Sequence, residues 1–127
     1  MALILAIEDH DDVLTLLSFV LKDHQVLLAP DSTSGLRMAK DLRPDLVLLD
    51  LGMPDVDGLE VCRALRREPA TADLPIIFVT ARIDMTENEA AWQAVGAQGA
   101  ISKPFSPTHL LSEVERVLAG RMGGSTR

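Results

Sequence analysis

Aromatic residues and cysteine are both scarce in this sequence. Its 127 residues include one Trp, three Phe and no Tyr, and Cys62 is the only cysteine. A lone cysteine excludes an intramolecular disulfide, so we expect a reducing compartment, namely the cytoplasm. No apolar run approaches the roughly 20 residues that span a bilayer, and the first residues lack the basic region of a signal peptide. We therefore expect no membrane insertion.

Basic residues are also few relative to acidic ones. The chain has 12 Lys and Arg residues against 19 Asp and Glu residues, which gives a net charge of −7 and a pI near 4.8. An acidic surface repels polyanions, so we expect no direct binding to nucleic acid. An apolar content of 47% and a charged content of 24% are typical of a globular chain, and the length suits one domain.

Five short apolar segments alternate with five amphipathic ones. The expected strands are Leu3–Ile7, Gln25–Ala29, Leu46–Leu49, Leu74–Val79 and Gly99–Ser102. The expected helices run from Val13 to Leu21, from Asp31 to about Leu42, from Asp57 to about Arg67, from a Thr86–Glu89 capping box to about Val95, and from Pro107 to about Ala119. This alternation predicts an α/β fold, a doubly wound parallel sheet with helices on both faces. We expect residues 1–119 to form one domain and the Gly-rich residues 120–127 to form a flexible tail or linker.

The third expected strand carries the most informative polar residue. The apolar run Leu46–Leu49 is followed by Asp50, and Gly52 and Gly58 then break the regular structure. A carboxylate at the end of a strand buried on both faces is costly unless something pairs with it. In open α/β sheets such strand ends are also where ligands bind. Asp50 is therefore the first candidate for a functional residue.

Polar residues also follow the ends of three other expected strands. They are Glu8 and Asp9 after the first strand, Thr80 after the fourth and Lys103 after the fifth. Because the carboxyl ends of parallel strands share one edge, we expect these side chains to surround one cleft with Asp50. Three carboxylates with room for water suit Mg²⁺, or Mn²⁺ in its place.

This set of residue types suits phosphoryl transfer. A carboxylate held beside Mg²⁺ is a competent nucleophile toward phosphorus, so Asp50 is the expected phosphoacceptor. The reaction needs mainly positioning and cations on the phosphoryl oxygens, which Mg²⁺ and Lys103 would supply. Thr80 would donate a hydrogen bond to the same oxygens, and Gly52 has no side chain to keep its carbonyl from the metal.

These motifs, in this order, resemble the receiver domain of two-component response regulators. They are Glu8-Asp9, Asp50-Leu51-Gly52-Met53-Pro54 with Asp57-Gly58, Thr80-Ala81 and Lys103-Pro104-Phe105, and the resemblance spans about Leu3 to Ala119. It implies a flavodoxin-like three-layer sandwich with strand order 2-1-3-4-5. It also implies Mg²⁺ held by Asp9, Asp50 and the Gly52 carbonyl, with Glu8 acting through water, and a cis Lys103–Pro104 bond.

The resemblance further implies partners and a role. The donor would be a histidine kinase or a histidine phosphotransfer protein, and the receiver would signal to a downstream protein or output domain. It would be a monomer or a phosphorylation-dependent homodimer. Such a domain is a switch that catalyses its own phosphorylation, and is not an enzyme with a separate substrate.

Two positions depart from or vary within the family pattern. Ala100 stands where the family usually has an aromatic residue that moves inward on activation, so the usual readout is not expected here. Arg82 lies two residues past Thr80, at a position that in the family tunes access of water to the phosphoryl group. A long cation there could either stabilise or shield that group.

Three other functions are compatible with parts of the sequence. A phosphatase of the haloacid-dehalogenase type would need a second Asp two residues after the nucleophile, where this chain has Gly52. A flavodoxin-like cofactor binder would need a Gly-rich loop after the first strand, where the acidic residues would repel a phosphate. A pseudo-receiver, an unphosphorylated interaction module, is favoured only by Ala100. We expect Trp92 to be a packing residue and the three histidines to lie at the surface, with His10 adjoining the cleft.

Overall fold

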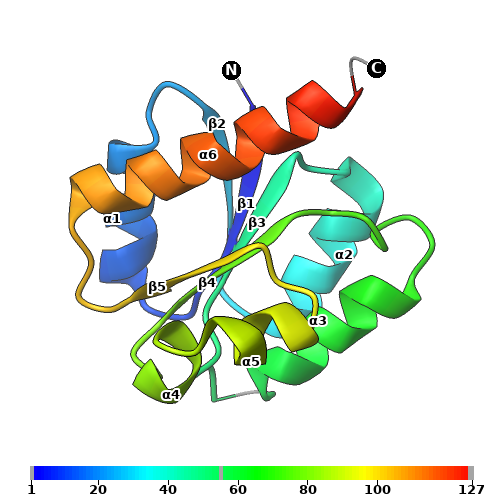
Figure 1. The fold of residues 1–127 in the computed structure, drawn as a ribbon. Helices are drawn as coiled ribbons and strands as arrows, with labels where there is room; N and C mark the ends of the chain where they lie inside the picture. The colour runs from blue at the N-terminus through cyan, green and yellow to red at the C-terminus, as the bar shows by residue number, and fades with distance from the viewer. Residues whose placement is uncertain (1, 55, 126–127) are drawn as a thin grey trace.

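The strands of the sheet are all parallel, as the alternating pattern predicts (Figure 1). The computed structural model describes residues 2–54 and 56–125. The strands are β1 (Leu3–Ile7), β2 (Gln25–Ala29), β3 (Leu46–Leu49), β4 (Ile76–Thr80) and β5 (Gly99–Ser102). Their order is β2-β1-β3-β4-β5, which confirms the expected doubly wound topology.

Helices cover both faces of this sheet. They are α1 (Asp11–Val20), α2 (Ser32–Leu42), α3 (Gly58–Arg67), α4 (Ile83–Thr86), α5 (Glu89–Ala94) and α6 (Pro107–Ser125). α1 and α6 lie on one side, and α2 and α3 lie on the other (Figure 1). Among the described residues, no helix is both long and apolar enough to cross a bilayer.

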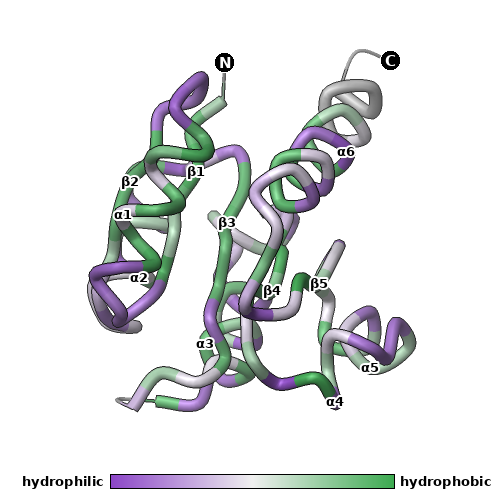
Figure 2. Tube along the Cα trace, turned by 90° about the vertical axis from the view of Figure 1, so that its left-hand side faces the viewer, coloured by the Kyte–Doolittle hydropathy of each residue, from purple (hydrophilic) through white to green (hydrophobic). Residues whose placement is uncertain are grey.

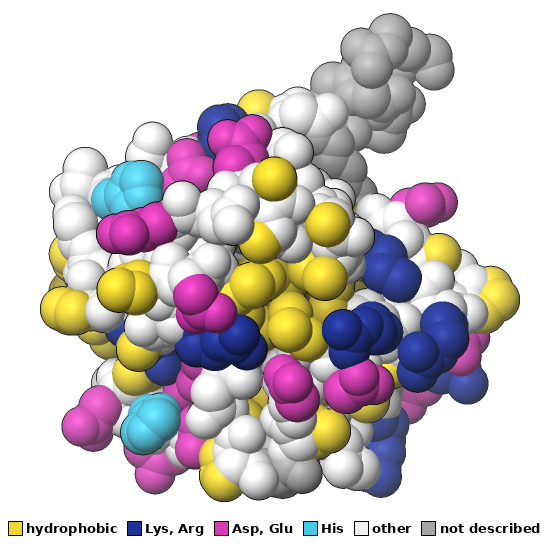
Figure 3. All heavy atoms as spheres, turned by 60° about the horizontal axis from the view of Figure 1, so that its bottom comes forward, with side chains coloured by type: hydrophobic (Ala, Val, Ile, Leu, Met, Phe, Trp, Pro, Cys, Tyr) yellow, Lys and Arg dark blue, Asp and Glu magenta, His cyan; other side chains and the backbone are white. Residues whose placement is uncertain are grey.

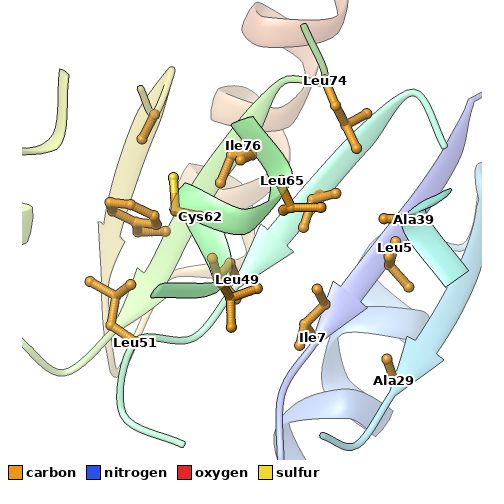
Figure 4. Close-up of a cluster of buried hydrophobic side chains, with 14 of the residues drawn as sticks. Leu5, Ile7, Ala29, Ala39, Leu49, Leu51, Cys62, Leu65, Leu74 and Ile76 are labelled. Atoms are coloured by element: carbon orange, nitrogen blue, oxygen red, sulfur yellow. The ribbon is translucent and has the colours of Figure 1, made fainter. Parts of the chain in front are cut away.

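Alternate side chains of each strand point to opposite faces of the sheet and pack into two separate hydrophobic cores. Ile4 and Ala6 of β1 pack with Leu14 and Leu17 of α1 and with one apolar face of α6. Leu5 and Ile7 pack into the opposite core, drawn in Figure 4 with residues of α2 and α3. The strands are correspondingly apolar on both faces, whereas the helices carry hydrophobic and hydrophilic residues in turn (Figure 2).

Two helix starts follow the expected capping chemistry. The Asp31 side chain accepts a hydrogen bond from the Ser34 amide at 2.7 Å, which caps α2. The Asp57 side chain accepts one from the Leu59 amide at 2.9 Å, which caps α3. Each contact satisfies an amide that has no partner within its helix. Because α3 starts directly after the loop that follows Asp50, this cap also fixes where that loop ends.

The segment between β4 and β5 differs from the prediction. The expected helix from Thr86 to Val95 is two short helices, and the expected capping box at Thr86 and Glu89 is wrong. Asn88 caps the second helix by accepting a hydrogen bond from the Ala91 amide at 3.1 Å. The Thr86 hydroxyl is used elsewhere, because Ser102 donates to it from β5 at 2.7 Å. Gly96 ends this segment with φ +94°, as a helix-terminating glycine should.

The last helix is longer than expected. Instead of ending near Ala119, α6 continues to Ser125. The expectation that residues 120–127 form a flexible tail or linker stays a prediction. Each residue added to an existing helix gains a backbone hydrogen bond, and no proline interrupts this one. Residues 126–127 lie outside the described residues, and the boundary of the domain at residue 119 stays a prediction.

One histidine is not at the surface. The His24 side chain is only 10% exposed. Its Nδ1 accepts a hydrogen bond from the Ala2 amide at 3.0 Å, and its Nε2 lies 2.9 Å from Glu115 Oε1. His24 therefore ties the start of β1 to α6, which neighbouring residues in the sequence could not indicate.

Candidate functional site

Four strand ends bring their polar side chains to one edge of the sheet. Glu8 and Asp50 directly follow the neighbouring strands β1 and β3, and they are 2% and 4% exposed. Lys103 directly follows β5 and reaches across to both: its Nζ lies 2.5 Å from Glu8 Oε1 and 3.2 Å from Asp50 Oδ2. The structure thus joins residues that are 95 positions apart in the sequence.

Asp50 sits in surroundings that favour its ionised form. Its Oδ1 accepts a hydrogen bond from the Gly52 amide at 3.0 Å, and its Oδ2 faces Lys103. Burial by itself would raise the pKa of Asp50, but the Gly52 amide and the Lys103 ammonium outweigh it and lower the pKa. A buried carboxylate is therefore kept charged, as a nucleophile must be.

Glu8 experiences the opposite balance. Burial raises the pKa of Glu8, and the hydrogen bonds from Lys103 and His10 offset this only in part. The nearby charge of Asp50 adds to the increase. One ammonium cannot fully compensate two carboxylates in a site of low polarity. Glu8 therefore takes up a proton more readily than Asp50 does.

His10 and Asp9 complete the cluster on its exposed side. His10 Nδ1 lies 2.9 Å from Glu8 Oε2 and 3.2 Å from Asp9 Oδ1. The hydrogen bond to Glu8 and the charge of Asp9 raise the pKa of His10. Asp9 Oδ1 is buried and accepts no hydrogen bond from the described residues, although the His10 ring lies close to it. A bound cation would compete only with this ring for the oxygen.

Thr80 ends β4 beside this cluster and is 1% exposed. It stands opposite Ser102 in the sheet, and its carbonyl accepts a hydrogen bond from the Lys103 amide at 2.9 Å. Its hydroxyl oxygen lies 3.3 Å from the Arg82 amide, from which it accepts a hydrogen bond. The Arg82 side chain turns to Asp84, with Nη2 2.9 Å from Asp84 Oδ2. Arg82 is therefore paired in this state.

The loop after Asp50 is shaped by close approach to α3. A Cβ on Gly58 would lie 2.5 Å from Leu51 Cα and 2.7 Å from the Asp50 carbonyl oxygen. Gly52 has no such restriction, because a Cβ there would meet only Asp50 Oδ1, at 3.7 Å. The Lys103–Pro104 peptide bond is cis, as the resemblance implied.

The donor atoms present fit a divalent cation. Glu8, Asp9, His10 and Asp50 each offer a ligand atom within 4.8 Å of the others. Carboxylate oxygens are the ligands that Mg²⁺ and Mn²⁺ prefer, and the Asp9 oxygen without a hydrogen bond gives such an ion a ready partner. The sequence indicated the carboxylates, but it placed His10 only beside the cleft. The only sequence feature that indicated His10 as part of the site was its position directly after Glu8-Asp9.

An open hollow lies at the other end of the sheet. It holds about 610 Å³ near the starts of β4 and β5, and Trp92, Pro75, Gln98 and Arg116 are among its lining residues. Trp92 is half-buried and packs against the core beneath α5, as expected of a packing residue.

The surface of the molecule is not uniformly acidic. On the face shown in Figure 3, charged side chains of both signs surround hydrophobic ones.

Comparisons with known proteins identify one family. The sequence pattern of the response regulator receiver domain matches residues 4–115. The DNA-binding dual master transcriptional regulator RpaA of Synechocystis sp. is 36% identical over 117 residues, 91% of this chain and 48% of that protein. The transcriptional regulatory protein AfsQ1 of Streptomyces coelicolor is 38% identical over 117 residues, with 91% and 50% covered. The chain thus spans about half the length of the curated relatives it matches.

Solved structures agree with this match. The chemotaxis response regulator CheY4 of Vibrio cholerae superposes with a TM-score of 0.83 at 33% identity, covering 92% of this chain and 98% of CheY4. The receiver domain of the sensor histidine kinase PA1611 of Pseudomonas aeruginosa gives a TM-score of 0.82 at 28% identity, with 93% and 98% covered. That structure has a magnesium ion coordinated in its active-site cleft.

Proposed function

The chain belongs to the response regulator receiver domain family, and from this premise we propose that Asp50 accepts a phosphoryl group in a Mg²⁺-dependent reaction. Phosphoryl acceptance is the general function of such domains, which serve in signalling. The observation that carries the proposal for this residue is its environment. Asp50 is buried, yet Gly52 and Lys103 lower its pKa and keep it ionised.

The reaction is a displacement at phosphorus. A carboxylate oxygen of Asp50 forms the new P–O bond while the bond from phosphorus to the donor breaks, and the electron pair of that bond leaves with the donor. With a phosphohistidine donor the P–N bond breaks, and the imidazole is released. The product is an aspartyl phosphate, a covalent state that water later hydrolyses.

Lys103 and Thr80 act on the phosphoryl oxygens. The Lys103 ammonium already lies 3.2 Å from Asp50 Oδ2, so its charge is in place where negative charge accumulates. The Thr80 hydroxyl is held at the end of β4 and donates a hydrogen bond to the transferred group. Both side chains act by position and charge, which is what phosphoryl transfer requires of a protein.

The acidic residues are proposed to hold the metal. Asp9, Asp50 and the Gly52 carbonyl would be direct ligands, with Glu8 acting through water. When bound, Mg²⁺ supplies charge neutralisation for the phosphoryl oxygens, and Mn²⁺ would serve in its place. The Asp9 oxygen that accepts no hydrogen bond and the magnesium ion in the PA1611 receiver support this assignment.

The proposed partners follow from the family. The donor is a histidine kinase or a histidine phosphotransfer protein, and the phosphorylated chain acts on a downstream protein or output domain as a monomer or a phosphorylation-dependent homodimer. Several relatives are named as DNA-binding, but this chain matches only about half of their length. Its charge of −7 supports the proposal that this domain itself contacts no nucleic acid.

One observation favours a second function, the pseudo-receiver. Ala100 is half-buried on β5 opposite Phe78, so no large side chain is available there to report on the site. A contact from β5 to α4 does exist, between Ser102 and Thr86. The intact acidic cluster favours phosphorylation over the pseudo-receiver.

The test is the intact mass of the protein after incubation with acetyl phosphate and Mg²⁺. We expect one phosphoryl adduct in the wild type and none in Asp50→Asn or in a metal-free sample. Asp11→Asn, which removes an exposed carboxylate from the first turn of α1, should keep the adduct. Folded, Mg²⁺-binding protein that gains no adduct would establish the pseudo-receiver instead.

A further inference from the structure

His10 contributes a nitrogen ligand to a cluster otherwise made of carboxylates. Its Nδ1 faces Glu8 Oε2 at 2.9 Å and Asp9 Oδ1 at 3.2 Å. We propose that His10 determines metal selectivity at this site, making it bind late transition-metal ions such as Zn²⁺ more tightly than its carboxylates alone would. This inference rests on the metal site of the proposed function and adds a residue and a ligand class to it.

The spacing of the donor atoms suits one shared ion. Around a tetrahedral Zn²⁺ ion with bonds of about 2.1 Å, two ligand atoms lie about 3.4 Å apart. The two distances from His10 Nδ1, 2.9 and 3.2 Å, are slightly shorter than this separation. Without a metal these are a hydrogen bond and an ion-pair contact of the ring, so a bound ion would replace the Nδ1 proton with only a small movement of the ring.

The backbone holds His10 in this position. The His10 amide donates to Glu8 Oε2 at 3.1 Å, and the His10 carbonyl accepts from the Val13 and Leu14 amides at 3.1 Å each. The residue is thereby tied both to the cluster and to the first turn of α1. Its side chain makes no capping hydrogen bond, so replacing it leaves the start of that helix intact.

Lys103 leaves the His10 side of the cluster free. The ammonium contacts Glu8 Oε1 and Asp50 Oδ2, whereas His10 faces Glu8 Oε2 and Asp9 Oδ1. The Asp9 oxygen is buried and accepts no hydrogen bond from the described residues. A cation on this side therefore meets oxygens of Glu8 and Asp9 without first displacing Lys103, and it takes the place of the proton between His10 Nδ1 and these oxygens, which leaves to solvent.

The choice of ion follows from ligand chemistry. Imidazole nitrogen suits Zn²⁺, Ni²⁺ and Cu²⁺, whereas Mg²⁺ prefers oxygen ligands and gains little from a nitrogen. His10 should therefore change the affinity for Zn²⁺ strongly and that for Mg²⁺ only slightly.

Competing sites for these metals are few. The described residues contain no other group of three or more potential metal ligands. Cys62 is buried, and both His24 ring nitrogens have partners. His109 lies exposed near the start of α6 and provides a matched surface control.

The test is isothermal titration calorimetry with Zn²⁺ and with Mg²⁺ on four proteins: wild type, His10→Ala, His109→Ala and Asp9→Asn. His10→Ala should weaken Zn²⁺ binding by about tenfold or more, since even an outer-shell partner is worth 10–100-fold. Its Mg²⁺ affinity should stay within about threefold of wild type, the ordinary context dependence of a site whose ligands are oxygens. His109→Ala should match the wild type with both ions.

Separate outcomes overturn the two claims. If Mg²⁺ affinity falls in Asp9→Asn but Zn²⁺ affinity is unchanged in His10→Ala, the metal site stands and the role of His10 is wrong. If Asp9→Asn binds Mg²⁺ as the wild type does, the proposed metal site itself is wrong. As a second readout, Zn²⁺ should shift the ring resonances of His10 in NMR spectra and leave those of His24 in place.

Discussion

Lys103 is the side chain that makes the two buried carboxylates compatible. Glu8 and Asp50 lie on neighbouring strands, and without a cation between them their charges would repel in a site of low polarity. The ammonium contacts one oxygen of each and favours the charged form of both. With the Gly52 amide it lowers the pKa of Asp50, whereas burial keeps the pKa of Glu8 raised. One residue directly after β5 thus acts on the charge state of two others.

Gly58 has a role that only its lack of a side chain explains. Gly58→Ala should lower the free energy of unfolding by about 1–3 kcal/mol, because a Cβ would overlap the backbone of Leu51 and Asp50. Urea denaturation followed by circular dichroism measures this.

Gly120→Ala is the matched control for that substitution. Gly120 is an exposed helical glycine with nothing within 4 Å of an added Cβ. Alanine there should stabilise α6 by up to about 1 kcal/mol, the difference in helix propensity. Equal stability of Gly58→Ala and the wild type would show that the loop after Asp50 adjusts freely.

At the residue scale the sequence predicted the types and order of the site residues, because each follows an apolar strand. It could not predict how they pair. Whether Lys103 contacts Glu8, Asp50 or both depends on strand order and side-chain reach. The contact of His10 with Glu8 and Asp9 depends likewise on the turn into α1.

Local patterns predicted element types better than element ends. The Thr86–Glu89 pattern is a valid capping sequence, but the Thr86 hydroxyl accepts from Ser102 on another strand, and Asn88 provides the cap. A contact between residues 16 positions apart cannot be inferred from a short window of sequence. α6 similarly passes Gly120, because one glycine in an existing helix costs only about 1 kcal/mol relative to alanine.

Glu113 on α6 makes the stability of the fold depend on pH in a predictable direction. Its hydrogen bond with Arg116, with Nη2 2.9 Å from Oε1, lowers the pKa of Glu113 below 4.5. The pair therefore stabilises the fold above the unfolded-state pKa, and this contribution is lost as the pH falls through the lower folded-state pKa.

The test compares Glu113→Gln with the wild type. At about pH 7 the variant should be less stable by about 0.2–1 kcal/mol, the range for a largely exposed pair. The difference should disappear at a pH below the folded-state pKa. In an Arg116→Gln background the pH-dependent part should be absent, and its persistence there would assign it to another partner. Thermal unfolding at each pH measures these differences.

The whole molecule is a sheet between two separate hydrophobic cores, and the strands contribute side chains to both. The α/β class could be predicted from the apolar strands alternating with amphipathic helices. The order 2-1-3-4-5 could not be derived from those patterns, because it depends on pairing between distant strands, and the resemblance alone supplied it.

Cys62 reports on the integrity of this arrangement. It is a fully buried residue of α3, its Sγ lies 3.2 Å from the Val95 carbonyl oxygen, and burial raises the pKa of the thiol. Labelling by a thiol reagent should therefore be slow in native protein and should accelerate with urea in parallel with unfolding. Fast labelling without denaturant would mean that α3 and the end of α5 separate in the native state.

The span between Glu8 and Lys103 also has a consequence for synthesis. The two side chains meet across nearly the whole chain, since one follows the first strand and the other follows the last. A nascent polypeptide that has not yet released β5 from the ribosome has no ammonium beside Asp50. If the proposed function is correct, copies that lack β5 and Lys103 would be poor phosphoryl acceptors, and a donor would phosphorylate only chains in which the fifth strand has joined the sheet.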